Sequence, residues 1–364
     1  MPGGYCASAC EACPADGACV ETATGAHCLA RCSRDADCRA DEGYACDPMW
    51  HACAIPNTTA LVPRACPLPP GVPARDPAFG PVAPGGELAT GKGLPDPADC
   101  DEGHACGTPV VATAGARVVV VYAAGGGVRV RTSRDGGATF APPSTPVVGN
   151  YGDVAVGRAI HVVSLVGSAY GAYGSADHRI DYVTSVDGGA TFSPPQTISG
   201  REDSIPFYLA NPVIAVDDRR GLVYVAYARG HRGGVWDVVI AVGKRVGTQL
   251  AWTRTRIGDD CAIHLLPTLA VDPATGTLHV AWYDSRGEHG RFAHATCGPG
   301  ATACKQRGAI SEPFTVPLST ERAGPRWLGE RAQLAVDPAK KTIHATWLEQ
   351  DGGAAHPRHA DGAL

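Results

Sequence analysis

Residues 132–143 read TSRDGGATFAPP, and residues 184–195 repeat them as TSVDGGATFSPP. Ten of the twelve positions are identical, and the copies lie 52 residues apart, within the period range of propellers and other repeat folds. An Asp followed by two Gly residues is typical of a tight hairpin turn, because the Asp side chain can bind the backbone two residues on and Gly accepts a positive φ. The Phe then returns the chain to an apolar layer. Each copy therefore predicts a hairpin between two strands.

Short apolar strands alternate with turns from residue 109 onward, without a long stretch of helical period. Five strand pairs recur at a similar spacing, at residues 109–122, 153–163, 212–227, 267–282 and 333–347. This pattern predicts an all-β chain of four-stranded propeller blades. The fifth blade has room for only two or three strands before Leu364, so we expect residues 77–108 to complete a sixth blade or the sequence to be a fragment.

The pattern Ser-x-Asp-Gly-Gly-x-Thr-Phe resembles the Asp-box (BNR) repeat of sialidase-like β-propellers, and the resemblance covers about residues 105–364. It implies a six-bladed propeller whose Asp boxes lie on turns between third and fourth strands, on the face away from the active site. It also implies a structural role for the residues of the two boxes, which are Ser133, Asp135, Gly136, Gly137, Thr139, Phe140, Ser185, Asp187, Gly188, Gly189, Thr191 and Phe192.

Cysteine is concentrated near the N-terminus, where ten of the fifteen cysteines lie within 66 residues. That density is typical of a disulfide scaffold in an oxidising compartment. A zinc site is the rival interpretation, since Cys10, Cys13 and either His27 or His51 are available as ligands. We favour disulfides because paired Cys-x2-Cys motifs are missing and because the ten cysteines of this region can all form pairs. The total of fifteen cysteines in the chain is odd, so at least one is free or paired between chains. The disulfide candidates are Cys6, Cys10, Cys13, Cys19, Cys28, Cys32, Cys38, Cys46, Cys53, Cys66, Cys100, Cys106, Cys297 and Cys304.

Composition divides the chain into three parts: a cysteine-rich module at residues 1–66, a Pro/Gly-rich linker at residues 67–104 that could contribute a closing strand, and a propeller at residues 105–364. The net charge of −5 argues against nucleic acid or an anionic membrane as a partner, and no apolar stretch is long enough to span a membrane. Met1–Cys6 lacks the features of a signal peptide. We therefore expect a secreted or envelope-exposed bacterial protein whose signal segment or lipid anchor is missing from this sequence.

Strand direction then identifies a second face. If the Asp-box turns lie on the bottom face, second strands end on the top face, where ligands normally bind. The polar residues expected there are Asn211, Arg229, His231, Arg232, Asp259, Asp260, His264, Tyr283, Asp284, Ser285, Arg286, Glu330, Arg331 and Glu349. Carboxylates and arginines around a funnel suit a polar, anionic glycan, because Arg binds a carboxylate bidentately. Solvated loop ends with local salt bridges are the alternative. The ligand-binding candidates are Tyr283, Asp284, Arg286, Arg229 and His264.

The resemblance also allows a test for sialidase activity. Sialidases hold the substrate carboxylate with three arginines and use an Asp acid/base and a Tyr nucleophile assisted by Glu. The first arginine should lie two residues before the start of a first strand, where this chain has Gly107, Ala210, Leu265 and Glu330. Arg331 is one position off, so its side chain should point to the other side of the strand.

We therefore expect a non-catalytic propeller that binds a glycan or a surface protein. The alternative is an exo-acting, sialidase-type glycoside hydrolase with a non-standard catalytic set, for which the candidates are Asp284, Arg286, Glu330, Arg331 and Glu349. A structural module of the cell envelope is a third hypothesis. The fold by itself does not choose among these three hypotheses.

Neither a cofactor nor a metal centre is expected. His161, His279 and His344 occupy equivalent positions of second strands, but other second strands have Val119 and Tyr224 there, so we expect a repeated packing position rather than metal ligands. One acidic stretch, made up of Asp99, Asp101 and Glu102, could bind a structural Ca²⁺, although it lacks the ligand spacing of known calcium loops.

Overall fold

The computed structural model describes residues 13–22, 25–42, 44–47, 51–54, 67–84, 109–124, 127–149, 151–167, 178–200, 203, 205, 211–231, 235–246, 249–258, 261–286, 289–314, 332–351 and 354–364. These residues form strands and two 3-10 helices, Asp35–Asp37 and Ala40–Glu42. No helix in these ranges is long and apolar enough to cross a bilayer. The fold is therefore all-β, as the strand pattern predicts.

Two antiparallel four-stranded sheets contain the repeated turns. The first sheet consists of β6 (Val110–Ala114), β7 (Arg117–Ala124), β8 (Gly127–Ser133) and β9 (Ser144–Val148). The second consists of β10 (Gly152–Val156), β11 (Ile160–Val166), β12 (Arg179–Ser185) and β13 (Gln196–Thr197). Each repeated turn connects the third strand of its sheet to the fourth, as predicted.

Three further sheets follow in chain order. The third consists of β14 (Val213–Asp217), β15 (Leu222–His231), β16 (Val235–Val246) and β17 (Gln249–Ile257). The fourth consists of β18 (Ile263–Val271), β19 (Leu278–Arg286), β20 (His289–Gly298) and β21 (Thr302–Ala309). A single parallel pair, Trp236 with Ile263, links these two sheets. The fifth sheet consists of β22 (Gln333–Asp337), β23 (Thr342–Asp351), β24 (Ala354–Ala363) and β5 (Ala83–Pro84).

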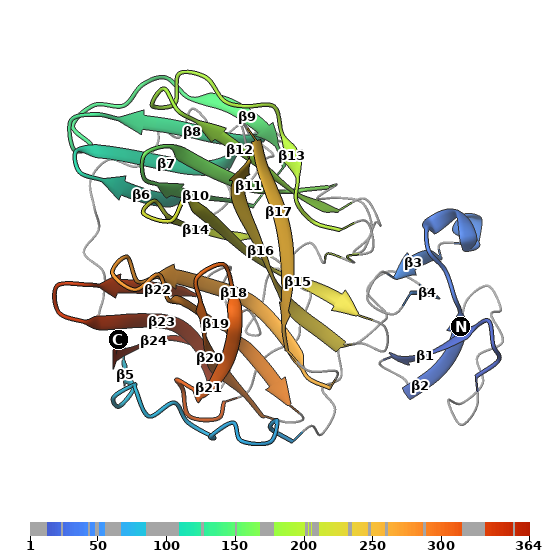
Figure 1. Ribbon diagram of the computed structural model, residues 1–364. Helices are drawn as coiled ribbons and strands as arrows, with labels where there is room; N and C mark the ends of the chain where they lie inside the picture. The colour runs from blue at the N-terminus through green and yellow to red at the C-terminus, as the bar shows by residue number, and fades with distance from the viewer. Residues whose placement is uncertain are drawn as a thin grey trace.

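The sheets succeed one another through their first strands. β6 contacts β10, β10 contacts β14, β14 contacts β18, and β18 contacts β22, which gives the fan of blades visible in Figure 1. Apolar side chains fill the space between neighbouring blades; Val121, Val154 and Ile160 belong to one such cluster, between the first two sheets. Between the fourth and fifth sheets, Phe292 stacks on Trp347 with ring centroids 5.3 Å apart. The described residues thus form five blades, and the expected number of about six stays a prediction.

Residues 67–84 are docked on the fourth and fifth sheets and are called the docked segment here. Asp76 Oδ2 lies 2.6 Å from His294 Nδ1 in a buried pair, and Arg75 pairs with Ala309. Further along, Ala83 pairs with His359, so this segment supplies the fourth strand of the fifth sheet. The expectation that residues 77–108 complete a sixth blade is wrong for Ala83 and Pro84, which instead add a strand to the fifth sheet. The open edge of β24 offers a backbone partner that the local sequence pattern does not reveal. The boundary at residue 104 stays a prediction.

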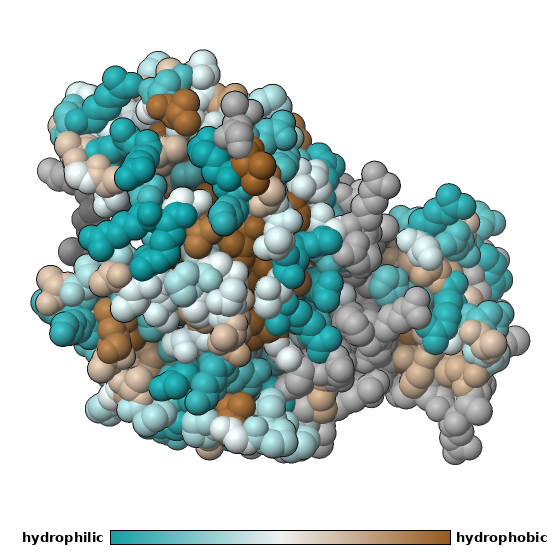
Figure 2. Space-filling view, viewed as in Figure 1, coloured by the Kyte–Doolittle hydropathy of each residue, from teal (hydrophilic) through white to brown (hydrophobic). Residues whose placement is uncertain are grey.

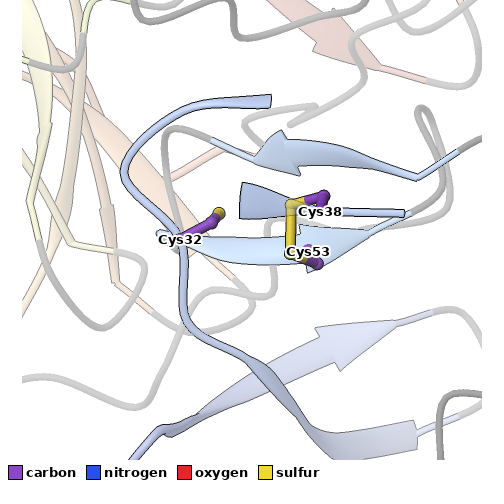
Figure 3. Close-up of side chains that lie close together, drawn as sticks. All are labelled: Cys32, Cys38 and Cys53. Carbon is purple, nitrogen blue, oxygen red and sulfur yellow. A yellow bond between two sulfur atoms is a disulfide. The ribbon is translucent and has the colours of Figure 1, made fainter. Parts of the chain in front are cut away.

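The cysteine-rich module contains two small hairpins, β1 (Gly17–Thr22) with β2 (Gly25–Ala30) and β3 (Ala45–Asp47) with β4 (Ala52–Ala54). Disulfides hold the described part of the module, among them Cys13–Cys28, Cys32–Cys46 and Cys38–Cys53. Figure 3 shows the Cys38–Cys53 bond with Cys32 beside it. Because Cys13 is in a disulfide, it does not supply the thiolate that the zinc alternative requires.

Other cysteines are oxidised as well. Cys297 and Cys304 form the predicted hairpin disulfide of the fourth sheet. Cys19 is disulfide-bonded, as expected, and so is Cys261, which was not among the candidates. The omission of Cys261 is an error of pattern reasoning, since its distance from the other cysteines in the sequence says nothing of its distance in the fold. The predicted disulfides of Cys6, Cys10, Cys66, Cys100 and Cys106 lie outside the described residues.

Candidate functional site

The repeated turns have the same hydrogen bonds in both copies. Asp135 Oδ1 accepts from Ser133 Oγ at 2.6 Å and from the Thr139 amide at 2.9 Å, while Oδ2 accepts from Thr139 Oγ1 at 2.6 Å. Asp187 makes the equivalent bonds to Ser185 and Thr191. These bonds hold the pKa of both aspartates well below the usual value. Both carboxylates are therefore engaged within their own turns.

At the opposite end of the sheets, three predicted site residues come together. His264 lies directly opposite Asp284 in the β18–β19 register, and Arg286 follows two residues later on the same face of the strand. His264 Nε2 lies 3.2 Å from Asp284 Oδ1, and Arg286 Nε donates to Asp284 Oδ2 at 2.8 Å. Burial would raise the pKa of Asp284, but the histidine and the arginine together hold it below its usual value.

Arg229, at the end of β15, organises a second group of charges. Its Nη1 donates to Asp203 Oδ1 at 2.8 Å, and its Nη2 lies 3.8 Å from Asp237 Oδ2. Burial opposes the charged form of Arg229, but the bond to Asp203 and the charge of Asp237 raise its pKa above the usual value. Arg256 Nε lies 3.1 Å from Asp237 Oδ2, and Arg254 Nη1 lies 3.6 Å from Asp203 Oδ2. Two aspartates are therefore surrounded by three arginines.

Gly258 lies where the two groups meet. Its φ is +144°, and a Cβ atom at this position would lie 2.6 Å from His264 Nδ1 and 3.0 Å from Asp237 Oδ1. Only glycine leaves room for this approach between the third and fourth sheets. We call the combined set the top cluster; it consists of Asp203, Arg229, Asp237, Arg254, Arg256, His264, Asp284 and Arg286.

In the top cluster the negatively charged side chains are buried and two of the positively charged ones are partly exposed. The side chains of Asp203 and Asp237 are 1% and 0% exposed, whereas Arg254 and Arg256 are 37% and 33% exposed. Arg286 is nearly buried, and its Nη1 donates to the carbonyl oxygen of Pro67 at 2.9 Å, at the start of the docked segment. The solvent-facing charge of the top cluster is therefore guanidinium.

Two other predicted site residues serve the fold. Tyr283 is fully buried, and its hydroxyl both donates to the carbonyl of Leu348 and accepts from the amide of Leu348. Burial raises the pKa of this phenol. Glu349 accepts from Trp347 Nε1 at 2.9 Å and from Arg358 Nε at 2.7 Å. Both side chains thus bind protein groups within or next to the fifth sheet.

Several predicted residues lie outside the described part of the chain. These are Arg232, Asp259, Asp260, Glu330, Arg331 and the calcium candidates Asp99, Asp101 and Glu102, together with the side chain of His231. Four residues of the top cluster were missed by sequence reasoning, namely Asp203, Asp237, Arg254 and Arg256. One signal could have revealed Arg254 and Arg256. They alternate with other residues after Trp252, so a strand over these residues would place both arginines on one face.

A groove of about 580 Å³ lies away from the top cluster, beside the second repeated turn. It is lined by Tyr182, Thr184, Val186, Thr191, Phe192, Ser193, Pro194, Pro195, Gln196, Arg245, Gln249 and Leu250. Tyr182, one of the lining residues, meets Trp252 edge to face, and its hydroxyl lies 2.7 Å from His161 Nδ1. In Figure 2, hydrophobic surface gathers near the middle of a largely hydrophilic face, where β16 and β17 run.

Solved structures with a similar fold include several carbohydrate-active enzymes. The Hadza microbial sialidase Hz136 is 14% identical with a TM-score of 0.45, over 72% of this chain and 66% of that chain. The endo-arabinase from Bacteroides thetaiotaomicron is 12% identical with a TM-score of 0.42, over 70% and 93%. An N-acetylgalactosamine deacetylase from F. plautii is 13% identical with a TM-score of 0.44, over 79% and 96%.

This chain has a β-propeller fold, built from antiparallel four-stranded sheets that contact one another through their first strands. At these identities and TM-scores, the likeness to solved structures supports no conclusion about activity. No protein-family profile and no curated protein matches the sequence. The chemistry of the top cluster is therefore what indicates a function.

Proposed function

We propose that this propeller is a non-catalytic binding module for glycans that carry a carboxylate, with the top cluster as its binding surface. The observation that carries the proposal is the sorting of charge by depth: arginines face the solvent and aspartates lie beneath them. A planar guanidinium matches a carboxylate bidentately, and a buried aspartate behind it fixes its orientation in advance. Arg254 and Arg256 are the residues expected to contact the ligand.

The state of the carboxylates favours binding over hydrolysis. A glycosidase needs a carboxylic acid with a raised pKa to protonate the leaving group. Asp284 has a lowered pKa and is bonded to Arg286, and Glu349 is bonded to Arg358. Asp284 is thus not suited to donate a proton near neutral pH, and the carboxylate of Glu349 is already engaged by an arginine.

The setting of the module is part of the proposal. Multiple disulfides persist in oxidising compartments, so we place the protein outside the cytoplasm, as a secreted or envelope-exposed protein. We interpret the repeated turns as Asp boxes that clip hairpins, since Asp135 and Asp187 are bonded within their own turns. A glycan is preferred to a protein partner because a few guanidiniums suffice to recognise a sugar carboxylate.

The test is a glycan array with the oxidised wild-type protein, Arg254→Ala, Arg256→Ala and the control Arg219→Ala. Arg219 is an exposed arginine of the turn between β14 and β15, away from the top cluster. We expect binding to uronate- or sialate-bearing glycans, weakened about 10- to 100-fold by either top-cluster substitution, since a charged hydrogen bond contributes about 1.5–3 kcal/mol. Arg219→Ala should bind as the wild type does.

A parallel assay with fluorogenic exo-glycosidase substrates separates the alternatives. Hydrolysis by the wild type that is lost in Asp284→Asn would overturn the non-catalytic proposal. Binding that is confined to neutral glycans, or that Arg254→Ala leaves unchanged, would show that the top cluster is not the binding surface.

A further inference from the structure

Two histidines and one aspartate converge on the fifth sheet, far from the top cluster in the sequence and not used by the proposed function. Asp361 Oδ1 lies 2.6 Å from His344 Nδ1 and 2.7 Å from His359 Nε2. The three ligand atoms all lie within 4.8 Å of one another. The two imidazole rings are nearly parallel, with an interplanar angle of 12° and centroids 6.2 Å apart.

Strand register explains why these side chains meet. His344 on β23 lies directly opposite Asp361 on β24, and His359 precedes Asp361 by two residues, so all three lie on one face of the sheet. The other face carries the buried residues Ile343, Ala345 and Ala360. The face with the histidines is partly open to solvent: the His344, His359 and Asp361 side chains are 35%, 37% and 53% exposed.

We propose that His344, His359 and Asp361 form a site for a divalent transition-metal ion, with Zn²⁺ as the physiological candidate. Two imidazoles and one carboxylate are a donor set that Zn²⁺, Ni²⁺ and Cu²⁺ prefer, whereas Ca²⁺ and Mg²⁺ prefer oxygen ligands alone. Both nitrogens already point at one carboxylate oxygen, so an ion needs to displace only two hydrogen bonds to bind all three ligands. Water completes the coordination of the ion.

The position of the site gives it a structural role. The ion would join β23 to β24, and His359 is directly opposite Ala83 of the docked segment. A ligand that binds only the folded state stabilises that state by mass action. Zn²⁺ should therefore stabilise the sheet in which residues distant in the chain, Ala83 and Pro84, pair with the final hairpin.

Calorimetric titration with Zn²⁺, together with Co²⁺ absorption spectra, tests the site in the oxidised full chain. We expect one ion per chain, a Co²⁺ spectrum typical of nitrogen and oxygen ligands without thiolate charge transfer, and a rise in Tm with added Zn²⁺. Asp361→Asn and His359→Ala should each weaken binding by at least about tenfold, as loss of one ligand requires.

His356→Ala is the matched control, because His356 is an exposed histidine of the same strand on the opposite face. It should bind Zn²⁺ within about twofold of the wild type. Since bound imidazole must be deprotonated, affinity should also fall as the pH is lowered. Equal binding by the wild type and both ligand variants, or no binding by folded wild type at millimolar Zn²⁺, would overturn the proposal.

Discussion

Three histidines of equivalent strand position have different surroundings in the folded chain. His161 is buried with its Nδ1 2.7 Å from the Tyr182 hydroxyl, and His279 is buried and stacked on His294. Burial lowers the pKa of both His161 and His279 to about 4. The third, His344, was expected to pack in the same way, but it is partly exposed and bonds Asp361. A shared strand position therefore does not give these imidazoles a shared chemistry.

The two buried histidines should make stability depend on pH. An unfolded histidine has a pKa near 6.5, so between about pH 6.5 and 4 the unfolded chain binds protons that the folded chain excludes. Stability is then fully present above about pH 6.5 and falls as the pH is lowered, by on the order of 3 kcal/mol per histidine at pH 4. Urea unfolding of the wild type and His161→Gln at pH 7.5, 6, 5 and 4 measures this dependence.

His161→Gln should show a shallower loss of stability across this window than the wild type. The control variant His356→Gln replaces an exposed histidine, and its stability should depend on pH as that of the wild type does. Parallel pH profiles for the wild type and His161→Gln would contradict the assignment of His161 as a buried neutral group.

At the scale of elements, the repeated turns are self-contained. Asp187 accepts three hydrogen bonds from Ser185 and Thr191, all within seven residues of one hairpin. Local bonds of this kind explain why the turn can be predicted from its residues alone. The docked segment is the opposite case, because the contacts that join it to the propeller sheets connect residues far apart in the chain.

Replacing Asp187 should loosen the second repeated turn. Asp187→Ala leaves the Thr191 amide and hydroxyl without their acceptor, so we expect a fall in Tm of a few degrees with the fold retained. Differential scanning calorimetry measures the change. Val186→Ala is the control, since Val186 is 77% exposed and adjacent to the aspartate; an equal effect of both substitutions would argue against the role of the carboxylate.

The docked segment should depend on Asp76. Asp76→Ala leaves buried His294 without its carboxylate, and the loss of one partner of a buried pair costs about 3–5 kcal/mol. The segment should then become accessible to trypsin at Arg75 under native conditions, as N-terminal sequencing of the fragments would reveal. Glu312→Ala removes only the exposed partner of Arg75 and should change little. Unchanged protection in Asp76→Ala would show that other contacts hold the segment.

At the scale of the whole molecule, two kinds of stabilisation divide the chain. The propeller sheets bury apolar clusters between blades, whereas the described part of the cysteine-rich module consists of short hairpins cross-linked by disulfides. Small domains with little core depend on such bonds, each contributing about 2–4 kcal/mol. The two parts should therefore differ in their response to reduction.

Reduction with dithiothreitol should open β1–β4 and leave the propeller folded. Hydrogen exchange read by mass spectrometry should show loss of protection in Gly17–Thr22 and Gly25–Ala30 while β7 and β15 stay protected. A variant with Cys297→Ala and Cys304→Ala should keep this difference, because its substitutions affect one hairpin of the fourth sheet. Simultaneous loss of protection in both parts would contradict the division.

The sequence by itself determined the features that depend on neighbours in the chain. The strand alternation, the position of the repeated turns between third and fourth strands, and the identification of His264, Asp284 and Arg286 as one polar end all follow from local periodicity and strand direction. Only the tertiary structure decided the rest: the disulfide of Cys261, the pairing of Ala83 with His359, the arginines around Asp203 and Asp237, and the meeting of His344 with Asp361. These contacts depend on the order and register of strands that are distant in the chain, and no local pattern of residues records that register.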